Sequence, residues 1–143
     1  IIIIIIIIII IIIIIIIMAL ERLDTILLFS SLTGRLDDIR SVLDQRANVN
    51  ATDASEATSL HLASRSGHAH CVELLIERKA NLNARAPHWT PLHYASFHGR
   101  KECARLLIDH GADTSIKDVC ERTTQSWCHS HDDIHRVVES SSY

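Results

Sequence analysis

The chain has 143 residues, and the first 17 are isoleucine, so that 126 residues remain for one small folded domain. Those 126 residues carry all 14 lysines and arginines and all 17 aspartates and glutamates, and the formal net charge is −3. This balance argues against a basic nucleic-acid clamp or a polybasic membrane binder. Four scattered cysteines do not form the dense pattern of a disulfide scaffold.

The isoleucine tract, residues 1–17, is interpreted as a placeholder or artefact and is set aside from the fold. It has no initiating methionine and no basic segment before it, whereas Met18 to Leu20 resembles an ordinary start of translation. The alternative is an apolar segment whose side chains are wrongly identified. Seventeen helical residues span about 26 Å, close to the hydrocarbon thickness of a bilayer. Under that alternative the protein lies in or beside a membrane.

The rest of the chain is a repeat. Segments 25–34, 58–67 and 90–99 align on a terminal glycine, with spacings of 33 and 32 residues. An amphipathic run and a short polar segment follow each glycine, and a degraded fourth copy starts at Thr123. Each unit is therefore predicted to be a helix, a tight turn, a second helix and an extended polar loop. The spacing of 32 also predicts a shortened or tilted hairpin in the third unit.

Capping residues recur at fixed places in each unit. The threonine that opens each copy, Thr25, Thr58 or Thr90, is predicted to be the N-cap of the first helix. Pro91 occupies the first helical position, where its missing N–H is tolerated. A glycine ends the first helix in a left-handed conformation. Left-handed conformations are also expected after the second helices, at Arg46, Lys79 and Gly111.

The repeat resembles the ankyrin repeat. The signature T-P-L-H-x-A is intact at residues 90–95 and has one change at residues 58–63, and G-A-D stands at residues 111–113. The resemblance covers about residues 20 to 139 and implies an all-α ankyrin solenoid of about three repeats plus a degenerate C-terminal cap. The implied domain is 18–139, with repeats at about 21–53, 54–85 and 86–118, a cap at 119–139 and a tail at 140–143.

The resemblance implies a non-catalytic module that binds a protein through its concave face and hairpin tips. In that family the positions just before the threonine and just before the helix-ending glycine face the partner. Trp89 and Phe97 stand out because aromatic side chains dominate interface hot spots. Alternatively, Trp89 lies on its own loop and Phe97 covers the edge of the core. The expected partner-binding residues are Arg65, Ser66, Pro87, Trp89, Phe97, His98, Arg122 and His131.

Other residues are expected to be structural. In the resembled family the signature histidines, here His61 and His93, tie neighbouring loops together, while Gly67, Gly99 and Gly111 terminate helices. His68 and His70 are expected to be solvated, and Arg65 and Arg122 either steer an acidic partner or are solvated. Cys71 and Cys103 are expected to be small, inert, buried side chains.

A metal site is considered at the C-terminal end. In a helix, Cys128, His131 and His135 would share one face, with Cys120 as a fourth ligand for zinc. The spacing matches no common zinc pattern, so no metal and no cofactor are expected. The chain contains no P-loop, dinucleotide fingerprint or G-x-S-x-G element, so no catalytic residues are assigned.

Two functions remain from the sequence. One is an adaptor with an exchangeable protein partner; the other is an accessory subunit held permanently in a larger complex, which lies at a membrane if the tract is a real apolar segment. The partner's identity is left open, and no nucleic acid is expected. Two free buried thiols favour an intracellular, reducing compartment, and the cytoplasm is preferred over an organelle.

Overall fold

A computed structural model of the protein describes residues 1–127 and residue 136. Within these residues the secondary structure is helical, with no strand and only two isolated bridges in the hairpin loops. The helices are α1 (Ile2–Thr33), α2 (Leu36–Asp44), α3 (Ser59–Ser66), α4 (Ala69–Glu77), α5 (Pro91–Phe97), α6 (Lys101–Asp109) and α7 (Thr124–Trp127).

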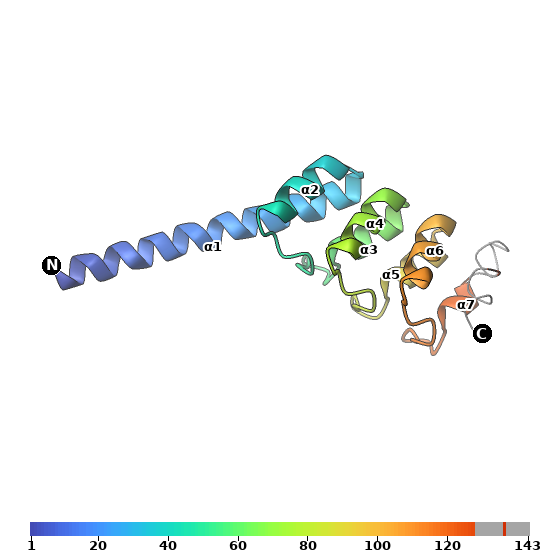
Figure 1. Ribbon diagram of the computed structural model, residues 1–143. Helices are drawn as coiled ribbons and strands as arrows, with labels where there is room; N and C mark the ends of the chain where they lie inside the picture. The colour runs from blue at the N-terminus through green and yellow to red at the C-terminus, as the bar shows by residue number, and fades with distance from the viewer. Residues whose placement is uncertain (128–135, 137–143) are drawn as a thin grey trace.

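The helices stack in two layers (Figure 1). Helices α1, α3, α5 and α7 pack side by side in one layer, and α2, α4 and α6 pack in the other. A tight turn joins the two helices of each pair, and the loops between pairs project from one side of the stack (Figure 1). This arrangement confirms the all-α solenoid that the sequence predicts.

Three columns of core residues hold neighbouring pairs together. Each column repeats one apolar position at the spacings of 33 and 32 residues, so a side chain of one unit lies on its equivalents in the next. All of these side chains are at most 4% exposed. The columns are Leu27, Leu60 and Leu92; Ile39, Val72 and Ala104; and Val42, Leu75 and Leu107.

Helix α1 differs from the sequence prediction. The helix is continuous from Ile2 to Thr33, so Thr25 lies inside it and the predicted N-cap is wrong. The residues before Thr25 are already helical, and its hydroxyl donates instead to the Glu21 carbonyl at 2.9 Å. An N-cap requires free backbone N–H groups, and in mid-helix these are already bonded.

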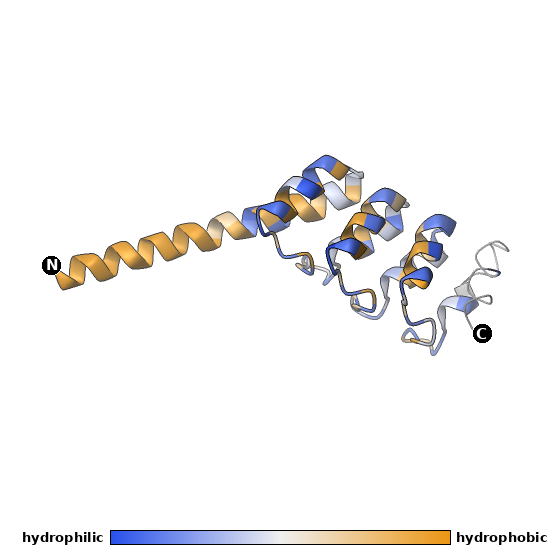
Figure 2. Ribbon diagram, viewed as in Figure 1, coloured by the Kyte–Doolittle hydropathy of each residue, from blue (hydrophilic) through white to orange (hydrophobic). Residues whose placement is uncertain are grey.

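The boundary predicted after residue 17 also falls inside α1. The isoleucine tract projects beyond the stack as a rod, apolar along its length (Figure 2). Within residues 1–127 and 136, α1 alone is long and apolar enough to cross a membrane, by length and composition.

The left-handed turn positions are confirmed. Gly67, Gly99 and Gly111 have φ values of 87°, 68° and 91°. Arg46 and Lys79 also adopt positive φ, of 71° and 65°, although neither is glycine. The geometry of the turn after each second helix therefore prevails over the preference of the side chain.

Cys71 and Cys103 are buried as predicted, at 2% and 1% exposed. Burial raises the pKa of the Cys71 thiol and raises that of Cys103 to about 11. Both thiols are therefore protonated and unreactive at neutral pH. Cys120 is exposed.

Alkylation should separate these thiols. With iodoacetamide at pH 8, we expect Cys120 to be modified at least about ten times faster than Cys71 or Cys103, because only thiolate in contact with water reacts. Peptide mass spectrometry would assign the rates, and in urea the three rates should converge. Equal rates in the folded protein would contradict the buried positions.

Candidate functional site

The hairpin before α3 is built on one aspartate. The Asp53 N–H donates to the Ala57 carbonyl at 3.0 Å and closes the hairpin. Asp53 Oδ1 accepts hydrogen bonds from the Ser55 N–H at 2.8 Å, the Ser55 hydroxyl at 2.6 Å and the Ala57 N–H at 3.0 Å. Burial raises the pKa of this carboxyl, but the hydrogen bonds outweigh it and the net pKa is lowered. The ionised carboxylate therefore fixes the shape of the loop.

The hairpin before α7 repeats this design at Asp118. Its Oδ1 accepts from the backbone N–H groups of Cys120, at 2.8 Å, and Arg122, at 3.0 Å. The guanidinium Nε of Arg122 lies 3.1 Å from Asp118 Oδ2, whose side chain is fully buried. Arg122 is thus half-buried and paired within its own loop, which differs from the expected solvated or steering side chain.

The hairpin before α5 is shorter, as the 32-residue spacing predicts. The Ala86 N–H donates to the Trp89 carbonyl at 2.8 Å. Two residues lie between this hydrogen-bonded pair, whereas three lie between the corresponding pairs of the other two hairpins. Ala86 replaces the aspartate, and the left-handed residue of the longer loops, Glu56 or Glu121, has no counterpart. The shortened loop places the Trp89 side chain against α5.

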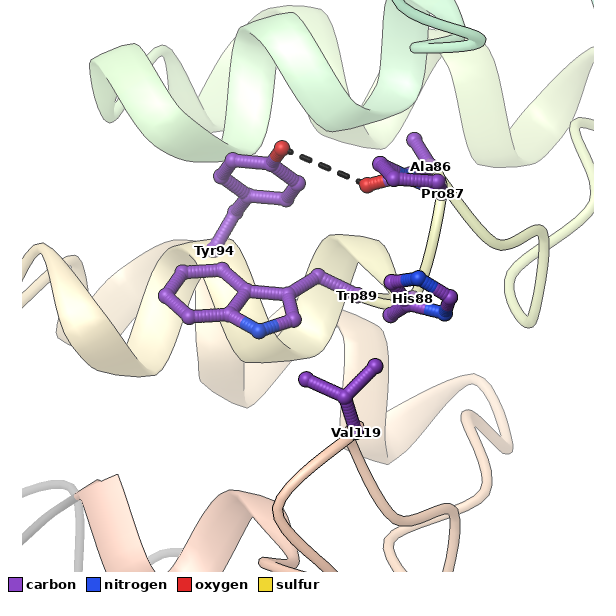
Figure 3. Close-up of a pocket in the computed structure, with 6 residues that line it drawn as sticks. All are labelled: Ala86, Pro87, His88, Trp89, Tyr94 and Val119. Atoms are coloured by element: carbon purple, nitrogen blue, oxygen red, sulfur yellow. Dashed lines mark hydrogen bonds between the residues drawn. The ribbon is translucent and has the colours of Figure 1, made fainter.

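A pocket of about 300 Å³ lies beside this short hairpin (Figure 3). The Tyr94 hydroxyl donates to the Ala86 carbonyl at 3.4 Å and closes one side (Figure 3). Val119 of the next hairpin projects toward Trp89 from the other side and is 63% exposed. The lining residues are Ala86, Pro87, His88, Trp89, Tyr94 and Val119.

An aromatic strip, defined as Trp89, Tyr94, Phe97 and His98, runs from this pocket to the end of α5. The ring centroids of Trp89 lie 5.2 Å from Tyr94 and 5.1 Å from Phe97, and Phe97 lies 5.1 Å from His98. Trp89 is half-buried against α5, while Phe97 remains 46% exposed. The strip therefore combines the two interpretations of the sequence, because Trp89 packs against α5 and Phe97 still faces outward.

The other expected partner-binding residues fall at different places. Arg65, Pro87 and His98 are exposed, and Ser66 is half-buried. His131 lies outside the described residues. Of the proposed zinc ligands, only Cys120 lies within the described residues, where no group of three or more metal-ligating side chains occurs; Cys128, His131 and His135 lie outside them.

His61 joins two repeats. Its Nδ1 accepts from the Thr58 N–H at 3.1 Å and lies 2.8 Å from the Thr58 hydroxyl. Its Nε2 lies 3.1 Å from the carbonyls of both Ala84 and Trp89 in the next hairpin. Two carbonyl acceptors require a proton on Nε2, which fixes the neutral tautomer. Burial lowers the pKa of His61 to about 4, although the two carbonyls oppose the shift.

His93 occupies the same position in the third repeat but is bonded on one side only. Its Nδ1 accepts from the Thr90 N–H at 3.3 Å. Burial lowers the pKa of His93, and the carbonyls of Ile116 and Arg122 raise it in part. Nevertheless, His93 Nε2 is buried and has no hydrogen-bond partner within the described part of the chain.

The residue after each helix-ending glycine reaches back to the preceding repeat, which the sequence analysis missed. His68 Nε2 lies 3.1 Å from the Leu32 carbonyl, and Arg100 Nε donates to the Arg65 carbonyl at 3.1 Å. Both acceptors stand at the carboxyl ends of helices, where carbonyls lack helical partners. The expectation that His68 is solvated is therefore wrong. The available signal was its fixed place after the glycine.

This contact predicts the effect of a methyl group at Gly34. A Cβ there would lie 2.7 Å from Cε1 and Nδ1 of His68, with φ at 78°. We expect Gly34→Ala to lower the free energy of unfolding by about 2 kcal/mol, roughly half from the left-handed backbone and half from the lost hydrogen bond.

Gly111→Ala is the matched control, because its φ is 91° and a Cβ would meet nothing within 4 Å. Urea denaturation should give about 1 kcal/mol for this variant, from the backbone alone. Equal losses in the two variants would show that the His68 contact contributes nothing.

Comparison with known proteins agrees with this geometry. A family model described as ankyrin repeats, in three copies, matches residues 25–118. The chain is 42% identical over 57 residues to inversin from Homo sapiens and from Canis lupus familiaris, and 39% identical over 57 residues to inversin from Danio rerio. These matches cover 40% of the chain and only 5–6% of the length of the relatives.

Proposed function

Because this chain belongs to the ankyrin-repeat family, whose members are generally protein–protein interaction modules, we propose that it binds a protein partner through its concave face and hairpin tips. The observation that carries the proposal is the aromatic strip beside the pocket. Phe97 keeps 46% of its surface exposed on a helix whose other side is core. When a partner covers a large apolar side chain in that position, the apolar surface leaves water and the free energy of binding becomes more favourable.

The proposal includes no catalytic step and no cofactor, in keeping with a family that is generally non-enzymatic. It also places the protein in an intracellular, reducing compartment, with the cytoplasm preferred over an organelle. The buried free thiols of Cys71 and Cys103 support that location.

Crosslinking mass spectrometry on the protein in its native extract tests the proposal. Lys117 borders the hairpin before α7, and we expect its crosslinks to reach one protein in fixed stoichiometry. Phe97→Ala should abolish those crosslinks, whereas Arg40→Ala on the exposed face of α2 should preserve them. Crosslinks that persist in Phe97→Ala would overturn the use of this surface. Circular dichroism would verify that both variants are folded.

A second candidate is an accessory subunit held permanently in a complex. The exposed side of α1 favours it, because Ile26 is 44% exposed and Phe29 is 57% exposed. These residues lie three apart on the first helix of the stack, where no preceding repeat covers them. Co-purification through high salt in constant stoichiometry would support this candidate, and Phe29→Ala should then release the protein. A partner that exchanges freely would exclude it.

A further inference from the structure

Positive charge gathers at one end of the aromatic strip. The cationic cluster consists of Arg65 at the end of α3 and Arg100 in the turn after α5. Arg100 Nε donates to the Arg65 carbonyl at 3.1 Å, which holds these two residues together. His98 at the end of α5 lies within electrostatic reach of both, because burial lowers its pKa and the positive charges of Arg100 and Arg65 lower it further.

The cluster is incompletely neutralised within the protein. Asp53 is the carboxylate that acts on Arg65, and the two border the same small cavity. Neither Arg65 nor Arg100 forms an ion pair with a carboxylate in residues 1–127 and 136. The guanidinium groups thus retain capacity for carboxylates from outside.

The pocket and the cationic cluster lie at opposite ends of α5. The pocket is at the hairpin before the helix, the cluster is at its end, and the aromatic strip connects them. Seven helical residues span about 10 Å. An extended peptide covers that distance in about three residues, at about 3.3 Å each.

We propose that the partner presents an extended acidic segment, with one apolar side chain in the pocket and carboxylates three or four residues away on the cationic cluster. This inference rests on the proposed function and specifies the chemistry of the partner at the same surface. The apolar side chain contacts Trp89, Tyr94 and Val119, and the carboxylates pair with Arg65 and Arg100. Charge complementarity at one end fixes which apolar segments bind.

A nucleic acid fits this surface less well. A phosphate backbone requires a continuous basic track, because its charge is evenly spaced. Glu56 and Glu121 are exposed at the tips of the two flanking hairpins, and the whole chain carries a net charge of −3. The positive potential is therefore local, which suits a short acidic segment.

A peptide library tests the inference. Ten-residue peptides with one fixed leucine and random flanks would be displayed on phage and selected on the immobilised full chain. We expect aspartate and glutamate to be enriched three and four residues from the leucine. The enrichment should disappear on Arg65→Glu and persist on Arg40→Glu, which makes the same charge change on the exposed face of α2.

Affinities of the leading peptide provide the quantitative readout. By fluorescence anisotropy we expect Arg65→Glu to weaken binding at least tenfold, and Phe97→Ala to weaken it at least fivefold. Raising the NaCl concentration from 50 to 300 mM should weaken it severalfold, because screening reduces the attraction of exposed charges. Far-UV circular dichroism and the urea midpoint would verify the fold of each variant.

Three results would overturn the inference. The selected peptides would show no enrichment of acidic residues, or the enrichment would be unchanged on Arg65→Glu. The third is that a fifteen-nucleotide oligothymidine binds the chain more tightly than the leading peptide does. The crosslinking experiment keeps this failure separate from that of the proposed function. If Phe97→Ala abolishes the native crosslinks but the library shows no acidic preference, only the acidic partner is wrong. If Phe97→Ala leaves the native partner bound, the proposed surface itself is wrong.

Discussion

Replacing His61 with alanine is expected to lower the free energy of unfolding by about 3 kcal/mol, because three backbone groups each lose a hydrogen bond that contributes about 1 kcal/mol. These groups are the Thr58 N–H and the carbonyls of Ala84 and Trp89. They belong to two successive repeats, so the substitution weakens the contact between repeats as well as the start of α3. Urea denaturation followed by circular dichroism measures the loss.

His93→Ala is the matched comparison, because His93 has the same place in the repeat and is equally buried. Its Nε2 makes no hydrogen bond within the described residues, so only the bonds to Thr90 are lost. We expect a destabilisation smaller than that of His61→Ala by at least about 1 kcal/mol. Equal losses would mean that the bonds from His61 to the next hairpin contribute nothing to stability.

Acidification from pH 7 to pH 4 is expected to destabilise the protein by about 3 kcal/mol through His61 alone, at about 1.4 kcal/mol for each pKa unit. In the folded protein the pKa of His61 is lowered from its ordinary 6.5 to about 4. Between these values the unfolded chain binds a proton and the folded chain does not. Stability is therefore complete above pH 6.5 and falls until about pH 4.

The other groups with shifted pKa values either act in the same direction as His61 or act outside this pH range. Burial also lowers the pKa values of His93 and His98, which adds destabilisation in the same direction. The lowered pKa values of Asp53 and Asp118 act below their ordinary 3.8, outside the window. Urea midpoints at pH 7, 6 and 5 would measure the slope, and His61→Ala should flatten it. A slope that is unchanged in His61→Ala would contradict the shifted pKa of His61.

The local order of α1 shows where sequence patterns fail. Thr25 occupies the same repeat position as Thr58 and Thr90, so the pattern predicts the same cap at all three. The two later threonines follow hairpins, whereas Thr25 follows residues that are already helical. Capping depends on what precedes the threonine, and a repeat alignment carries no such information.

The aromatic strip was predicted only in part. The sequence places Trp89 and Phe97 at positions where this fold faces a partner, but it does not say whether they touch. Their contact follows from the shortened hairpin, which brings Trp89 against α5, 5.1 Å from Phe97. Tyr94 and Arg100 carry no sequence signal of their own at this surface. Their roles arise from the stacking of one repeat on the next.

The sequence by itself determined the repeat, its helix pairs, the turn glycines and the amphipathic run of each unit. Each of these depends on residues within one unit or on one position repeated at a fixed spacing, and such patterns are legible along a chain. The family resemblance already implied that His61 ties neighbouring loops together. Only the tertiary structure decided that its acceptors are Ala84 and Trp89, that His68 contacts Leu32, and that a pocket lies beside Trp89. These depend on distances between repeats of a few ångströms. One residue fewer in a hairpin changes such distances without changing the pattern.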